Sequence, residues 1–309
     1  PQRLLSMSRR ADSLLLHVGL QEPWGAAPRI ALAHAMVQTW IGGVLWIGPD
    51  DAAHEAESYW FSEGVARYFA REILFRVGLL DPDEYRDAIA LDLAIAFTSR
   101  RKGESNAALA AHVADEGALG LLVARGSLYA LGASARIRQR TAGKRSLDAV
   151  MLALFERGRA EKRRVLPTSA WLDAIATEGG EAERAAFERS IGEGRAPALP
   201  SDALGPCFRR GQGRYPRFDV GFDEAATLAS KDHVILGLER GGPAERAGLR
   251  AGDALVRSTR TPDSVKDGER LEVRRGDKTL ELRYLPVGES YPGDVWTRVA
   301  GIPNEKCKP

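Results

Sequence analysis

The sequence predicts an α+β protein in which a mainly helical domain precedes a small β domain. From Ile30 to about Ile191, apolar residues recur every three or four positions, which is typical of amphipathic helices. Residues 194–216 are rich in Pro and Gly and lack this period, and beyond them the apolar runs shorten to strand length. We therefore expect four segments: a helical domain at 1–200, a linker at 201–214, a β domain at 215–289 and a C-terminal tail at 290–309.

Two helices of the first domain are placed by their terminal signals. Asp81, followed by Pro82 and acidic residues, predicts a helix that begins at Pro82, because Asp is a good N-cap and Pro is tolerated in the first turn. Ser146 predicts the start of a later helix, with Gly158 as its stop.

The β domain contains five short apolar runs that predict strands. They are RFDVGF (217–222), HVILGLE (233–239), ALVRS (254–258), RLEVRR (270–275) and TLELRYLPV (279–287). The last two runs flank Gly276 and Asp277, a pair that favours a two-residue hairpin turn.

The composition limits the classes of partner. The 309 residues are 44% hydrophobic and 28% charged, as in a globular protein, and 44 basic against 42 acidic residues leave a net charge of +2. We expect no nucleic-acid partner, because no field of the whole molecule attracts a polyanion. Residues 136–164 carry ten Lys or Arg and three acidic residues, a run more typical of a solvated helix face than of a polyanion site. No stretch approaches the roughly 20 apolar residues of a bilayer span, so we expect no membrane span.

Only two cysteines are present, Cys207 and Cys307, too few and too far apart for a thiolate zinc site. Two alternatives stay open: free thiols, or a disulfide that holds the C-terminal tail beside the start of the β domain. A disulfide would favour an exported or periplasmic protein.

The segment LAHAMVQTWIGG, residues 32–43, has one feature of a zinc-peptidase helix. Such helices carry His-Glu-x-x-His, in which two histidines bind zinc and the Glu deprotonates the metal-bound water. Here the frame holds His34, Ala35 and Gln38. A third ligand comes from elsewhere, and YWFSEGVARYF, residues 59–69, resembles the helix that supplies it, with Ser62 as cap and Glu63 in the first turn.

With these two segments the chain resembles the glycyl aminopeptidase family of zinc metallopeptidases. Members carry a His-Glu-x-x-His helix, a Trp-x-Ser-Glu-Gly-Phe helix with the third ligand, and a C-terminal PDZ domain. The helical segment that begins LLVARG at residue 121 is similar to a family segment in which a Tyr-x-Lys/Arg-Gly stretch supplies a tyrosine for the oxyanion. The resemblance implies a thermolysin-like, gluzincin-type helical domain and a bacterial origin.

The C-terminal part adds to the resemblance. LERGGPAERAGLRAGDALV, residues 238–256, resembles the string that recurs in bacterial PDZ domains. Such domains bind a peptide as an added strand at a sheet edge. The resemblance implies a peptide site near Val220, Gly221 and Phe222. Only 14 residues between Val256 and Leu271 remain for the groove helix, so a packing role is an equal alternative to peptide capture.

Transferred residue by residue, the resemblance places the first zinc histidine at His34, the second at Gln38 and the glutamate ligand at Glu63. The general base falls on Ala35, which accepts no proton, and the tyrosine falls on Val123, which has no hydroxyl. Three catalytic tasks are lost, so we expect a pseudopeptidase with a peptide- or protein-interaction role, no catalytic residues and no bound cofactor or metal.

Three simpler or competing interpretations remain. His34 is more often a core histidine than a ligand when its partner is Gln38, and Glu63 can simply stabilise a helix start. A working zinc aminopeptidase would need an unorthodox ligand set of His34, His54 and Glu63. The third alternative is a scaffold that contacts protein partners through its PDZ-like domain.

Overall fold

The structure is a computed structural model. It describes residues 5–10, 13–19, 24–49, 51, 53–259, 265–266 and 268–307. The chain divides into two compact units. The helical unit contains residues 5–17, 24–213 and 293–307, and the β unit is built on residues 214–292.

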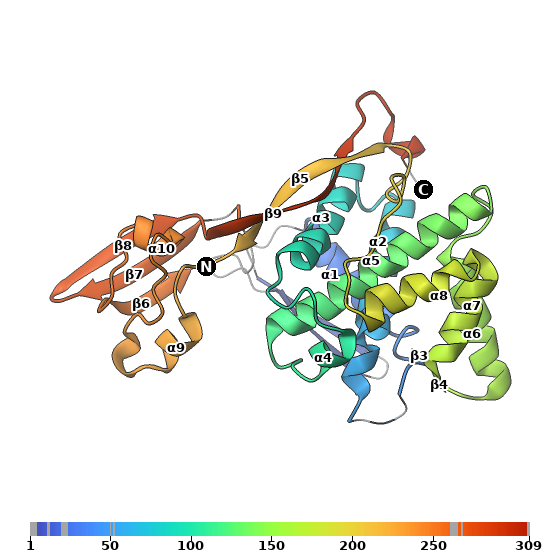
Figure 1. Cartoon of the computed structure of the whole chain (residues 1–309), viewed down its shortest axis with the longest axis horizontal. Helices are drawn as coiled ribbons and strands as arrows, with labels where there is room; N and C mark the ends of the chain where they lie inside the picture. The colour runs from blue at the N-terminus through green and yellow to red at the C-terminus, as the bar shows by residue number, and fades with distance from the viewer. Residues whose placement is uncertain are drawn as a thin grey trace. The chain divides into compact units, whose positions relative to one another are not determined.

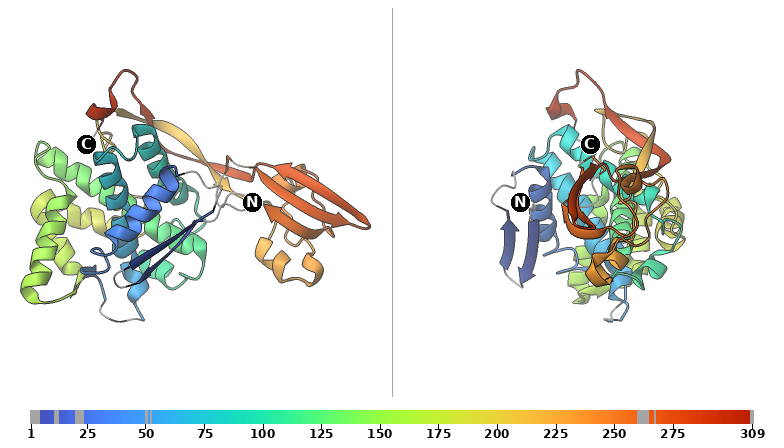
Figure 2. Two further views of the ribbon diagram at one scale, coloured as in Figure 1. Left: turned by 180° about the vertical axis from the view of Figure 1, so that it is seen from behind. Right: turned by 90° about the vertical axis from the view of Figure 1, so that its left-hand side faces the viewer.

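The helical unit is formed by helices of very different length (Figure 1). Its helices, with 3-10 and π segments labelled η, are α1 Ala26–Val37, η1 Glu55–Ser58, η2 Trp60–Val65, α2 Ala66–Arg76, α3 Pro82–Thr98, α4 Asn106–Ala110, α5 Glu116–Arg140, α6 Leu147–Glu161, α7 Thr168–Gly179, α8 Ala182–Phe187, η3 Glu188–Gly192 and η5 Asn304–Lys306. Two small sheets accompany them. Strands β1 Leu5–Arg10 and β2 Ser13–Val18 pair and lie beside α1 (Figure 2), while β3 Trp46–Ile47 and β4 Val165–Leu166 pair in parallel.

Helix α5 is the central element of this unit, in contact with η2, with α2 to α4 and with α6 and α7 (Figure 1). Among the described residues it is also the one helix long and apolar enough to cross a membrane, over Gly117–Arg140, and 89% of its apolar window is buried inside the unit. The expectation that no stretch reaches such length is therefore wrong for α5. Burial on all sides is what a core helix shows.

Two glycines allow η2 to pack directly on α5. A Cβ built at Gly126 would lie 2.1 Å from the backbone oxygen of Trp60, and one built at Gly64 would lie 2.8 Å from the Cα of Gly126. Neither position has room for a side chain. The backbone of the segment that carries Glu63 is thus held against the middle of the core helix.

The helix starts follow the sequence signals more closely than the ends. Helix α3 begins at Pro82 with a complete capping box between Asp81 and Glu84, as predicted. Helix α6 begins after Ser146 as predicted, but it runs through Gly158 to Glu161, and Lys162 ends it in the left-handed conformation with φ 53°. The predicted cap at Ser62 is wrong, because this residue lies within the π-helix η2, which continues directly into α2.

The β unit contains a three-stranded antiparallel sheet of β6 Ala254–Thr259, β7 Glu269–Arg275 and β8 Lys278–Tyr284. The predicted hairpin is present, with Arg275 opposite Lys278 across a two-residue turn. Its short helices are α9 Glu224–Ala229, η4 Lys231–His233 and α10 Pro243–Arg246. Two predicted strands are only partly present. Of residues 217–222, only Arg217 and Phe218 lie in a strand, at the end of β5 Phe208–Phe218, and residues 233–239 contribute a single bridge between Val234 and Ala254.

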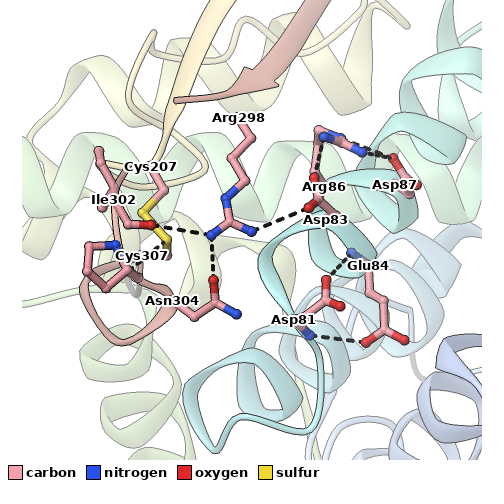
Figure 3. A network of polar contacts seen from close by, with 11 residues as sticks. Asp81, Asp83, Glu84, Arg86, Asp87, Cys207, Arg298, Ile302, Asn304 and Cys307 are labelled. Carbon is pink, nitrogen blue, oxygen red and sulfur yellow. Dashed lines mark hydrogen bonds and ion pairs between the residues drawn. A yellow bond between two sulfur atoms is a disulfide. The ribbon is translucent and has the colours of Figure 1, made fainter. Parts of the chain in front are cut away.

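Strands β5 Phe208–Phe218 and β9 Val287–Arg298 pair with each other, and both pass from one unit to the other. Residues 208–214, expected as part of a linker, are therefore extended strand. Within the helical unit, Cys207 and Cys307 form a disulfide across 100 residues of sequence. Arg298 lies beside it, 3.3 Å from Asp83 Oδ2 and hydrogen-bonded to the carbonyl of Ile302 (Figure 3). The C-terminal tail is thus fastened to the helical unit by a covalent bond and an ion pair.

Candidate functional site

Helix α1 and the π-helix η2 bring together the three positions that the resemblance assigns to zinc ligands. The side-chain amide of Gln38 donates a hydrogen bond to Glu63 Oε1 at 2.6 Å. His34 Nε2 lies 3.1 Å from the backbone oxygen of Glu63 and 3.7 Å from its Oε2. His34 and Gln38 share one face of α1 because they are four residues apart. The predicted meeting of α1 with the Glu63 segment is present in the structure.

The electrostatic setting of the site disfavours a charged imidazole. Burial lowers the pKa of His34 to about 4; the bond to the Glu63 carbonyl opposes this, while the charges of Arg67 and Arg71 add to it and Asp92 opposes them. His34 is therefore neutral at pH 7. With its Nε2 proton donated to the Glu63 carbonyl, this nitrogen presents no lone pair toward Glu63.

The sequence analysis did not predict the buried ion cluster that lies behind the site. Asp92 of α3 is fully buried and receives Arg67 at 3.0 Å and Arg71 at 2.7 Å. Arg71 also donates to the carbonyl of Ala88 and to the hydroxyl of Ser127. Because Arg67 and Arg71 follow Glu63 at steps of four, the cluster supports the same helical segment that carries Glu63. This spacing is the signal by which the two arginines could have been found.

The two other positions to which the resemblance assigns catalytic groups lie on elements of the same unit. Ala35 is buried on α1, with 6% of its surface exposed. Val123 lies half-buried on α5, and its backbone oxygen is 2.9 Å from a Cβ built at Gly64, the residue after Glu63. Val123 thus lies beside the segment that carries Glu63.

Two further residues, His54 and Tyr129, have their polar atoms engaged elsewhere. His54 lies on the surface, where its Nδ1 is 2.7 Å from Asp51 Oδ1, and this partner raises its pKa. Tyr129 is buried and accepts a hydrogen bond from Trp171 Nε1 at 3.1 Å. It belongs to the aromatic core around Trp60, so it offers no hydroxyl to the site.

The residues present do not fit a catalytic zinc ion. Such a site needs three protein ligands and an open position. Here one imidazole and one carboxylate are joined by a neutral amide, a weak donor to zinc, and the amide proton is directed at the carboxylate. Within the described ranges, no group of three His, Cys, Asp or Glu residues is placed to hold a metal ion.

Three backbone groups of the expected peptide site are hydrogen-bonded within the β unit. The Gly221 amide donates to Asp219 Oδ1 at 2.9 Å, and its carbonyl accepts from the amide of Glu239 at 2.8 Å. The carbonyl of Val220 accepts from the Tyr284 hydroxyl. Phe222 lies in the core of the unit.

Residues 49–138 match the model of a family described as M61 glycyl aminopeptidase. This part of the chain is similar to the glycyl aminopeptidase family. A solved structure of an aminopeptidase N family protein from Idiomarina loihiensis matches with a TM-score of 0.61 and 17% identity, over 96% of this chain and 59% of that one. The similarity at this identity concerns the fold, and the present chain spans 59% of the length of that protein. None of the curated proteins searched matches the sequence.

The limits of the family match are informative about the site. The matched range contains Glu63 and Val123 and begins after α1, so His34, Ala35 and Gln38 lie outside it. The glycyl aminopeptidase signal is therefore carried by the η2 to α5 core, and not by the helix on which the family has its first two zinc ligands.

Proposed function

We propose that the protein is a catalytically inactive glycyl aminopeptidase relative, a pseudopeptidase that retains a peptide- or protein-interaction role. The observation that carries this proposal is the hydrogen bond from Gln38 to Glu63 at 2.6 Å. Two positions assigned to zinc ligands satisfy each other, and a half-buried polar pair of this kind needs no metal to be stable.

The other positions support the same conclusion. Ala35 supplies no general base, a loss that commonly costs about 10² to 10⁴ in rate. Val123 supplies no hydroxyl to a developing oxyanion. With one imidazole and one carboxylate in place of three ligands, no residue here holds and activates a hydrolytic water.

The decisive experiment is metal analysis of the unmodified chain. After dialysis against zinc and then against buffer, we expect well below one zinc per chain, and no hydrolysis of glycyl-p-nitroanilide. Stoichiometric zinc or turnover would overturn the proposal and favour the alternative enzyme with His34, His54 and Glu63. The double variant Ala35→Glu/Gln38→His should gain stoichiometric zinc, whereas the matched variant Ala35→Glu alone should not, because it restores no ligand.

A second candidate function rests on the β unit, which we propose to be PDZ-like. Helix α10 starts at Pro243 after an extended Gly242, and Gly252 and Asp253 lead into strand β6, the order expected of such a domain. The unit would then act as a peptide-binding scaffold. Capture of a peptide carboxylate at Gly221 would have to displace Asp219 from its amide.

The scaffold function is tested with short peptides on the full chain. A library of C-terminal pentapeptides is compared with the same peptides made as carboxamides, which keep the side chains and lose the terminal charge. Binding of acids but not of amides supports a PDZ-type site, and equal binding of both contradicts it. We further propose an oxidising compartment, periplasmic or extracellular, because the Cys207–Cys307 disulfide persists only where thiols are not kept reduced.

A further inference from the structure

The helical unit contains a pocket of about 400 Å³ that the vestigial site does not use. The size falls within the usual range for sites that bind small molecules, about 300 to 1,000 Å³. The residues that matter for its chemistry are Glu57, Trp60, Asn106, Thr168, Phe187 and Ile191. They come from six helical segments, so the pocket is a product of the tertiary fold.

One side of the pocket is apolar. Trp60, Phe187 and Ile191 line it, and each is at least 94% buried. The rings of Trp60 and Phe187 meet edge to face, with centroids 5.0 Å apart. Trp60 opens the π-helix η2 and Ile191 lies in the π-helix η3. Because π turns are rare and are frequently found at functional sites, two of them at one pocket single it out.

Asn106 gives the pocket a hydrogen-bond donor. Its Oδ1 accepts from Arg125 at 2.6 Å, and because a guanidinium can only donate, the remaining side-chain atom is the amide nitrogen. Asn106 is 3% exposed, and this nitrogen has no hydrogen-bond partner in the described part of the chain. A ligand oxygen that reaches this nitrogen from the pocket would supply the missing acceptor.

Helix α7 adds a second feature that favours an acceptor oxygen. Thr168, its first residue, lines the pocket, and no side chain caps the helix start. Uncapped backbone amides and the positive end of a twelve-residue helix attract a carboxylate. Thr168 and Asn106 therefore favour the same kind of ligand group.

Glu57 gives the pocket its charge. It is half-buried, and its carboxylate forms no ion pair and no hydrogen bond within the described ranges. The neighbouring His54 is already paired with Asp51. An unpaired carboxylate on a pocket wall favours an ammonium group on the ligand.

We propose that this pocket binds a free α-amino acid with a large apolar side chain. The ammonium group faces Glu57, the carboxylate faces Asn106 and the start of α7, and the side chain lies against Trp60, Phe187 and Ile191. This binding involves neither His34 nor hydrolysis, so it stands independently of the pseudopeptidase proposal.

The test measures by calorimetry the binding of L-phenylalanine, and of two fragments of it, to the full chain at pH 7. Phenethylamine lacks the carboxylate, and 3-phenylpropanoate lacks the ammonium. L-phenylalanine should bind saturably, and each fragment at least about tenfold more weakly, because each loses one charge-assisted hydrogen bond. Absence of saturable binding, or equal affinity for a fragment and the amino acid, would overturn the proposal.

Two pairs of variants locate the binding. Ala107 is exposed on α4 and lines the pocket, whereas Ala108 is exposed on the same helix and does not. Ala107→Trp should abolish binding and Ala108→Trp should retain it. Glu57→Gln should weaken L-phenylalanine about tenfold and leave 3-phenylpropanoate unchanged, with Glu55→Gln as the neutral control. Binding that survives Ala107→Trp would place the ligand elsewhere and contradict the assignment.

Discussion

Gln38 and Glu63 lie on different helices, and their side chains are joined by a hydrogen bond of 2.6 Å from the amide nitrogen to Oε1. The resemblance to the glycyl aminopeptidase family assigns a zinc ligand to each of these two positions. Here Gln38 and Glu63 are hydrogen-bonded to each other, while His34 Nε2 donates to the Glu63 carbonyl. A metal ion entering this site would have to break bonds that the protein has already formed.

The lowered pKa of the part-buried His34 predicts a pH dependence of stability with a definite sign. Its folded pKa of about 4 lies below the ordinary 6.5, so between these values the unfolded chain takes up a proton that the folded chain refuses. The free energy of unfolding should therefore fall as the pH is lowered from 6.5 toward 4, by at most about 3 kcal/mol from this residue. Urea titrations across this range measure it.

The variant His34→Gln isolates the contribution of this residue, because an amide does not titrate. Its unfolding free energy should depend less steeply on pH over the same range, although Arg67, Arg71, Asp92 and Glu63 are unchanged. The exposed His112 provides the control, and His112→Gln should leave the profile as it is. Identical slopes for His34→Gln and the unmodified chain would contradict the buried setting of His34.

The contact between η2 and α5 predicts opposite effects of two similar changes in one helix. Gly126→Ala would place a methyl group 2.1 Å from the Trp60 carbonyl oxygen, and we expect it to cost about 3 kcal/mol or more. Gly120 has no atom within 4 Å of its Cβ position, so Gly120→Ala should stabilise by about 0.5 to 1 kcal/mol. Thermal unfolding of the two variants decides, and equal melting temperatures would argue against the close approach.

The disulfide predicts a large effect on the stability of the tail attachment. Removing it in Cys207→Ala/Cys307→Ala frees a loop with a sequence separation of 100, and we expect a loss of about 3 to 5 kcal/mol. Dithiothreitol should then leave the stability of the double variant unchanged. It should lower that of the unmodified chain, because unfolding exposes the disulfide to reduction. A variant as stable as the oxidised chain would show that Arg298 and β9 hold the tail without the covalent bond.

The ion cluster behind the site predicts that loss of a buried carboxylate lowers the stability more than loss of an exposed one. Asp92→Asn leaves Arg71 buried without its counter-ion, at an expected cost of about 3 to 5 kcal/mol. Glu161→Gln removes an exposed partner of Arg157 and should change stability by about 0.5 kcal/mol or less. Denaturant unfolding at neutral pH compares the two, and a similar small effect for both would contradict the burial of Asp92.

Local signals predicted local structure well and long-range structure unevenly. The start of α3 follows from Asp81 and Pro82, because a capping box is made within one turn of chain. The end of α6 does not follow from Gly158, because the helix is carried past it and ends where Lys162 adopts a left-handed conformation. Residues 233–239 have a strand-like pattern but bridge only through Val234, since strand formation needs a partner that the sequence does not specify.

The candidate site likewise has features that the local sequence predicts and features that only packing decides. The spacing of His34 and Gln38 and the likeness of the Glu63 segment to a family helix were enough to predict which residues meet. The hydrogen bond that closes Gln38 on Glu63, and the Asp92 cluster behind it, depend on three helices whose relative placement is decided by packing.

From the sequence alone came the order of a helical part before a β part, the starts of its well-capped helices, and the alanine at position 35, where the resemblance places a general base. These are properties of short stretches, governed by period, capping and residue chemistry. Only the tertiary structure decided that α5 is a buried core helix, that the residues at the zinc-ligand positions bond to one another, and that Glu57, Asn106 and Thr168 surround one pocket. Burial and contact are shared properties of segments far apart in the chain, and no local pattern encodes them.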